Sequence, residues 1–80
     1  MFRYSADAAR GLVDRRLNRQ TGTLVSIYLA DEAGIDTDGV KYAVVCEEHG
    51  AILAVSNLKL ARYDMASPMD WCEDCRGERA

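Results

Sequence analysis

The feature that most constrains this chain is the spacing of its cysteines and its histidine. The 80 residues include three cysteines and one histidine. They fall into a C-x2-H pair followed by a C-x2-C pair, and the residues are Cys46, His49, Cys72 and Cys75. Two intervening residues allow a short turn to bring both ligands onto one ion, and Cys3His is a known ligand set of structural zinc sites. The pattern therefore predicts one tetrahedral Zn²⁺ site that uses all four residues.

Other uses of these cysteines explain the pattern less well. A disulfide would use two of the three cysteines and leave one thiol unpaired. Cysteines that are simply buried as small apolar residues would not be expected to share a regular two-residue spacing with the only histidine. A redox pair at Cys72 and Cys75 should begin a helix after a strand, and we expect the residues after Cys75 to be too few for that helix. Iron–sulfur clusters usually take four cysteines. Zinc is the favoured interpretation.

The length of the chain indicates one small zinc-stapled domain over residues 1–80. A chain this short buries only about 60–65% of its unfolded surface, so its apolar core is marginal. A structural zinc ion supplies a staple that chains below about 70–80 residues often need. We expect residues 1–39 to hold a helix, the first strand and an acidic loop, and residues 40–75 to form the zinc-binding half.

Charge and hydropathy narrow the environment. The formal net charge is −3, which makes the chain a poor general partner for nucleic acid. The first ten residues lack the apolar core of a signal peptide, and no apolar run approaches the length of a membrane span. Because the thiols are assigned to metal, a reducing cytoplasm is the expected location.

Hydrophobic periodicity predicts an α+β fold. Residues 5–19 are predicted to form an N-terminal helix with an apolar stripe at helical spacing, ending near Gly22. Residues 23–30, 40–46 and 51–55 are predicted strands of a three-stranded antiparallel meander, with the acidic loop 31–39 after the first. The first zinc pair would then lie at the tip of the hairpin formed by the second and third strands.

The segment between the two ligand pairs is ambiguous. Residues 56–66 contain good helix formers and a possible cap at Ser56 or Asn57, but part of the segment also alternates like a strand. We expect a second helix, which would end before Pro68. The following segment would return the C-x2-C pair to the hairpin tip, where Trp71 would shield the metal from water.

The motif C-E-E-H-G at residues 46–50 resembles a zinc knuckle, and a knuckle at a hairpin tip is similar to those of zinc-ribbon and treble-clef proteins. The longer pattern with W-C-x2-C also resembles small uncharacterised bacterial proteins, a likeness that implies no activity. The resemblance covers residues 40–75 and implies Cys46, His49, Cys72 and Cys75 as ligands. A zinc ribbon would have its second pair on another hairpin, and a treble clef would have a helix carrying the last ligand.

We expect a non-enzymatic module with a structural zinc ion that mediates protein–protein interaction or regulation. The partner would be another protein or a second copy of the chain, because both faces of the first two predicted strands carry apolar residues. The alternative is a nucleic-acid-binding zinc protein that uses the arginines of the predicted first helix, Arg10, Arg15, Arg16 and Arg19. Catalysis is disfavoured, because a catalytic zinc ion needs an open coordination position and the only histidine is assigned as a ligand.

Overall fold

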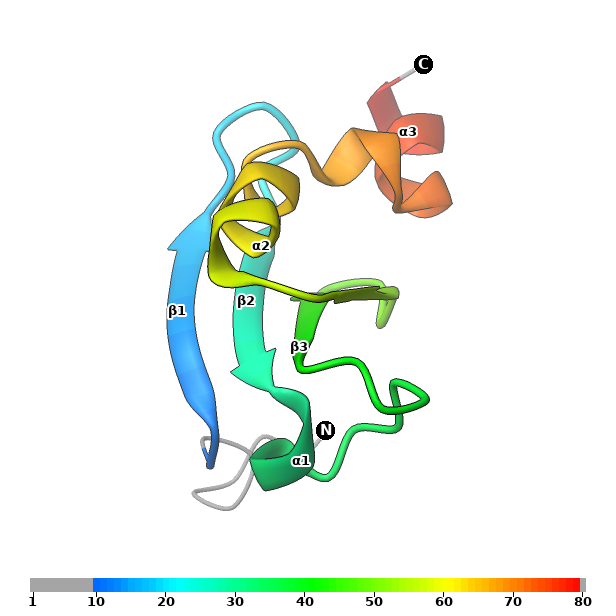
Figure 1. Ribbon diagram of the computed structural model, residues 1–80. Helices are drawn as coiled ribbons and strands as arrows, with labels where there is room; N and C mark the ends of the chain where they lie inside the picture. Colours follow the sequence, from blue (N-terminus) through cyan, green and yellow to red (C-terminus); the bar gives the residue numbers. More distant parts are fainter. Residues whose placement is uncertain (1–9, 80) are drawn as a thin grey trace.

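The computed structural model describes residues 10–79, which form an antiparallel sheet with one helix on a face, a short helical turn at one end and further helices at the other end (Figure 1). The sheet contains β1 (Leu12–Leu17), β2 (Leu24–Leu29), β3 (Tyr42–Cys46) and β4 (Ile52–Val55), in that order across the sheet. The helical elements are α1 (Ala30–Ala33), α2 (Leu58–Met65), the 3-10 helix η2 (Pro68–Asp70) and α3 (Glu73–Arg79). The fold is α+β, as expected, but its first half differs from the expectation.

The prediction of an N-terminal helix over residues 5–19 and a three-stranded meander is wrong. Residues 5–9 lie outside the described residues, and β1 occupies the rest of the predicted helix as a fourth strand. Gly11 has a φ of +80°, which a helix interior does not allow. The turn after β1 forms a hairpin, since Gly22 at φ +72° donates its N–H to the carbonyl of Asn18. Strand pairing with β2 therefore overrides the helical periodicity.

The remaining predicted elements are found with small changes in their bounds. β2, β3 and β4 lie within the predicted strands 23–30, 40–46 and 51–55, and each pairs antiparallel with the next. The ambiguous segment 56–66 contains α2. Asn57 caps α2, because its side chain accepts a hydrogen bond of 2.9 Å from the N–H of Leu60. The first backbone N–H groups of a helix have no partner within the helix, and this hydrogen bond satisfies one of them.

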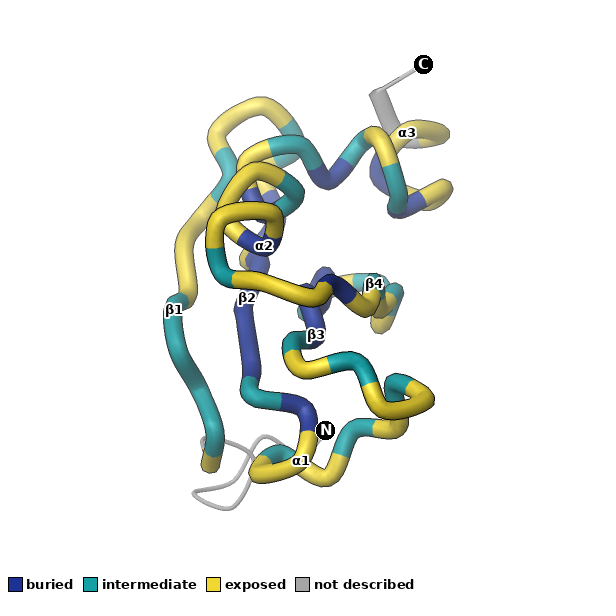
Figure 2. Tube along the Cα trace, viewed as in Figure 1, coloured by how far each residue is buried: buried dark blue, intermediate teal, exposed yellow. Residues whose placement is uncertain are grey.

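The main core lies between the sheet and α2. Burial is deepest along the middle strands and the inner side of α2 (Figure 2). Ala61 and Met65 of α2 pack against alternate residues of the sheet, as expected when one face of a strand is buried. The fully packed members of this cluster are Val25, Ile27, Val44, Val55, Ala61 and Met65.

The opposite face of the sheet holds a second, smaller cluster. Tyr28, Ala43 and Val45 lie on this face and pack with Ala30 of α1 and with Ile35 of the loop that follows it. The one-turn helix α1 ends at Gly34, which is left-handed at φ +73°. Residues 31–39, predicted as a loop, therefore begin within a helical turn.

The C-terminal segment lies beyond the end of the sheet at which β1 and β2 are joined (Figure 1). It consists of η2 and α3, and it carries the second pair of predicted ligands. Among the described residues, no helix is both long and apolar enough to cross a membrane.

Candidate metal centre

The first ligand pair lies in the turn between β3 and β4. Cys46 is the last residue of β3, and its carbonyl accepts a 2.7 Å hydrogen bond from the N–H of Gly50. Gly50 has a φ of +77°, a conformation that glycine adopts without strain. The N–H of Cys46 bonds to the carbonyl of Ala51 at 2.8 Å. This tight turn brings Cys46 and His49 together at the hairpin tip.

The second pair lies at the start of α3. Cys72 directly precedes the helix and Cys75 lies in its first turn. The N–H of Cys72 donates to the carbonyl of Pro68 at 2.8 Å, and Arg76 donates from Nε to the carbonyl of Met69 at 2.9 Å. These bonds join α3 to η2. The expectation that the residues after Cys75 are too few for a helix is wrong, because α3 begins before Cys75 and includes it.

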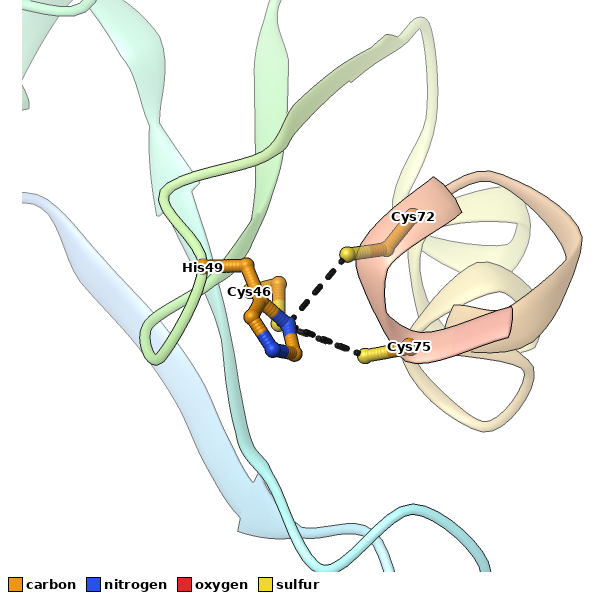
Figure 3. Close-up of side chains that lie close together, drawn as sticks. All are labelled: Cys46, His49, Cys72 and Cys75. Atoms are coloured by element: carbon orange, nitrogen blue, oxygen red, sulfur yellow. Dashed lines mark hydrogen bonds between the residues drawn. The ribbon is translucent and has the colours of Figure 1, made fainter. Parts of the chain in front are cut away.

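The four side chains converge on one point (Figure 3). One ligand atom from each of Cys46, His49, Cys72 and Cys75 lies within 4.8 Å of all the others. The Nδ1 atom of His49 lies 3.4 Å from Sγ of Cys46, 3.6 Å from Sγ of Cys72 and 3.4 Å from Sγ of Cys75. A single ring nitrogen has one proton or one lone pair and cannot make three hydrogen bonds. The arrangement is therefore that of ligands around a metal ion.

Burial and contacts within the cluster shift the pKa values of Cys75 and Cys72 in opposite directions. All three cysteines are fully buried. Burial, together with hydrogen bonds to the other two thiols, raises the pKa of Cys75 to about 12. Burial also acts to raise the pKa of Cys72, but hydrogen bonds from Cys75, Cys46 and His49 outweigh it and lower that pKa. Three thiolates this close together require a cation, since like charges oppose one another's ionisation.

A buried hydroxyl group contacts the cluster from the turn between β1 and β2. Thr23 is only 2% exposed, and its Oγ1 lies 3.7 Å from Sγ of Cys75. The same Oγ1 lies 2.6 Å from Oγ1 of Thr21, whose hydroxyl bonds to Oδ1 of Asn18 at 3.2 Å. When Cys75 is a thiolate, the single hydroxyl proton of Thr23 is donated to it, and the hydroxyl proton of Thr21 is then directed to Thr23 instead of Asn18. Outer-shell hydrogen bonds of this kind orient ligands and tune their affinity for the metal.

The knuckle is anchored to the sheet through Glu47. Its backbone N–H donates to the carbonyl of Leu24 at 2.9 Å. Its carboxylate accepts a 2.7 Å bond from the hydroxyl of Tyr28 and a 3.2 Å bond from Nη2 of Arg15. Arg15 also donates from Nε to Ser26 at 2.8 Å. The carboxylate of Glu47 is therefore held by the sheet and turned to its outer face.

The structure divides the predicted arginine cluster. Arg15 faces Tyr28 and Glu47 on one side of the sheet. Arg16 lies on the other side, where its Nε bonds to Asp14 at 3.2 Å. Arg19 lines a groove with Arg16, and Arg10 is exposed at the turn before β1. The four arginines therefore do not belong to the one helix that was predicted, because Arg15 and Arg16 lie in β1.

Three residues of the centre make contacts that no local pattern in the sequence indicates: Thr23, Tyr28 and Glu47. The contact between Tyr28 and Glu47 arises from the pairing of β2 with β3, and that of Thr23 arises from the position of α3, so each joins residues distant in sequence. Trp71 was predicted to shield the metal. It packs against both the main core and the cysteine cluster, and its Nε1 donates to the carbonyl of Asp64 at 2.8 Å.

Comparison with known proteins adds no relationship. No protein-family model, curated protein or solved structure is similar enough to this chain to count as a match. Functional conclusions therefore depend on the geometry of the site and on the surface of the described residues.

Proposed function

We propose that this protein is a small structural-zinc module that binds another protein. The observation that carries the proposal is the convergence of Cys46, His49, Cys72 and Cys75 on one point. Three sulfur ligands and one imidazole nitrogen are a closed Cys3His set, which is typical of structural zinc.

The distances between ligand atoms support zinc. A tetrahedron built with the usual zinc bond lengths has edges of about 3.8 Å between two sulfurs and about 3.6 Å between sulfur and nitrogen. Cys46 and Cys75 have a sulfur–sulfur distance of 3.6 Å. The three distances from sulfur to Nδ1 of His49 are 3.4, 3.6 and 3.4 Å. These four distances differ from the tetrahedral edges by only a few tenths of an ångström.

The layout of the ligands favours one of the two resemblances suggested by the sequence. One pair is at a hairpin tip and the other at the start of α3. A zinc ribbon would have both pairs on hairpins, whereas a treble clef has its last ligand on a helix. We therefore favour similarity to the treble clef for the local arrangement around the metal.

A structural role is preferred to a catalytic one. Four protein ligands leave no position for a water molecule or a substrate. Glu47, the most buried carboxylate beside the ligands, is engaged by Tyr28 and Arg15 rather than directed at the metal. The carboxylate of Glu47 is therefore engaged in holding the turn of residues 46–50 against the sheet.

The surface supports binding to a protein. Among the described residues, five large apolar side chains are exposed: Leu17, Leu24, Ile52, Leu60 and Tyr63. Scattered exposed apolar residues are normal, but Leu17 and Leu24 are paired neighbours on adjacent strands. The predicted arginine cluster is divided, with Arg15 on one side of the sheet and Arg16 and Arg19 at a groove on the other. This makes the nucleic-acid alternative less favourable, because such binding usually uses basic residues clustered on one face.

Cobalt substitution tests the closed site. Zinc is replaced by Co²⁺, and the absorption spectrum is recorded before and after addition of azide, a small anion that binds open coordination positions. We expect one ion per chain, a tetrahedral spectrum with sulfur-to-metal charge transfer, and no response to azide. An azide-dependent spectrum would indicate an open position and would contradict the structural role.

A further inference from the structure

A groove lies between α2 and the end of β1 that leads into the turn to β2, and none of the residues that line it is a predicted metal ligand. Its cavity volume is about 250 Å³. Arg16, Arg19 and Arg62 line it, together with the carboxylate of Asp14 and the apolar side chains of Leu17 and Met65. Residues from two elements distant in sequence therefore build one basic groove with an apolar component, which we call the β1–α2 groove.

The charge of the groove is opposite to that of the chain. Three guanidinium groups and one carboxylate give it a formal charge of +2, whereas the chain as a whole carries −3. The rest of the chain therefore carries −5. An acidic partner is therefore attracted to the groove and repelled by the rest of the chain.

Asp14 orients two of the arginines. Its Oδ2 lies 3.2 Å from Nε of Arg16 and 3.8 Å from Nε of Arg62. The side chains of Arg16 and Arg62 are 70% and 55% exposed. Asp14 contacts both arginines at Nε, and guanidinium groups have further N–H donors that suit a second carboxylate. The groove is therefore prearranged for carboxylates.

The size and lining of the groove identify the class of partner. Pockets for cofactors and drug-sized molecules usually span about 300–1,000 Å³, so this groove suits one or two side chains of a peptide. Single-stranded nucleic acid is usually bound by stacking on aromatic side chains, and no aromatic residue within residues 10–79 lines the groove. The side chain of Leu17, 64% exposed beside the arginines, offers a contact for an apolar side chain.

We propose that the β1–α2 groove binds an acidic peptide segment of a partner protein, with Arg16, Arg19 and Arg62 contacting its carboxylates and Leu17 contacting an adjacent apolar residue. This inference rests on the proposed function and specifies the partner. Recognition of acidic motifs by arginine clusters is a recurring mode of peptide binding.

A peptide-display selection tests this proposal. A random ten-residue library is panned against the zinc-loaded protein, and the recovered peptides are measured by fluorescence anisotropy. We expect enrichment of sequences with several Asp or Glu residues and an apolar neighbour. The double substitution Arg19→Ala and Arg62→Ala should weaken their binding about fivefold to tenfold, because two partly exposed ion pairs are lost. Lys59→Ala, an exposed cation of α2 outside the groove, should bind as the wild type does.

The location and the class of ligand are tested by amide NMR of the same zinc-loaded protein. Selected peptides should shift the amides of residues 14–19 and 62–66. Absence of enrichment, recovery of peptides that are not acidic, equal binding by the double variant, or shifts confined to other residues would each overturn the inference. If duplex DNA shifted the resonances of these amides and the peptides did not, the groove would be a nucleic-acid site and the inference would be overturned. Because cobalt substitution tests the metal site separately, failure of the groove is distinguishable from failure of the structural-zinc role.

Discussion

Removal of the metal by EDTA is expected to unfold this protein at room temperature. Structural zinc in small peptides binds with an apparent free energy of about 10–16 kcal/mol at pH 7. A domain of this size has a total stability of about 4–12 kcal/mol. If the cluster of Cys46, His49, Cys72 and Cys75 binds zinc with an affinity in that range, loss of the ion removes about as much free energy as the folded state possesses.

The structure indicates which part should be released first. The cluster of three cysteines is separate from the main core beneath α2. The segment 68–79 reaches the sheet through that cluster and the Thr23 contact, and it reaches α2 through Trp71. Chelation leaves the thiols of Cys46, Cys72 and Cys75 without the ion that joins them. We therefore expect the segment to detach before the sheet loses its order.

Tryptophan fluorescence follows this step, because Trp71 is the only tryptophan in the chain. On addition of EDTA its emission should shift to the red as the ring leaves the core, with loss of circular dichroism at the same or a higher EDTA concentration. One equivalent of Zn²⁺ should restore both signals. Glu48→Ala changes an exposed residue of the same turn that is not a ligand, and its response should equal that of the wild type. Unchanged fluorescence and an unchanged melting curve in EDTA would refute the reasoning.

Three further predictions concern residues around the centre and at the start of the sheet. Thr23→Val should weaken zinc binding at least tenfold in competition with a chelating dye, because it removes the outer-shell donor; equal affinity would argue against that role. Tyr28→Phe should cost about 1–2 kcal/mol at pH 7 in urea unfolding, because two hydrogen bonds of the phenol are lost. Burial first, and then the neighbouring carboxylate, raises the pKa of Tyr28 in the folded state. Wild-type stability from this group is therefore complete below the unfolded pKa of about 10 and falls as pH rises above it; the difference from the variant should narrow in that range, and a constant difference would contradict the assignment. Gly11→Ala should lower the free energy of unfolding by about 2–3 kcal/mol, because a left-handed alanine costs about 1–2 kcal/mol and its Cβ would lie 2.9 Å from the carbonyl oxygen of Leu29. Gly22 is also left-handed but has open space around it, so Gly22→Ala should cost only the conformational strain of about 1–2 kcal/mol. Equal losses of stability in the two variants would exclude the steric cause.

The ligand cluster could be predicted from sequence because its information is local. Each pair has a two-residue spacing that one turn or one helical start can satisfy. The only long-range requirement was that the two pairs meet. The β3–β4 hairpin could also be predicted, from the strand pattern of its two segments and from Gly50, which adopts the positive φ that such a turn requires.

The first strand could not be predicted in the same way. The segment from Leu12 to Leu17 carries charged residues at three consecutive positions, a pattern that suits an exposed helix as well as an edge strand. Its state is decided by pairing with β2, in which Arg15 lies opposite Ser26, and by a left-handed Gly11. The periodicity of a short polar segment contains neither constraint, so helical spacing was misleading there.

The second half of the metal site shows why residue counts are a poor guide to helix formation. α3 has seven residues, and isolated helices shorter than about 12–15 residues are marginal in water. Its stability must therefore come from tertiary contacts. Arg76 supplies two of them, since it donates to the carbonyls of Met69 and Asp70 at 2.9 and 2.8 Å, and Cys75 supplies the contact with the cluster. The helix and the metal site are thus interdependent: the helix presents Cys75 in its first turn, and coordination of that residue would hold the helix against the end of the sheet.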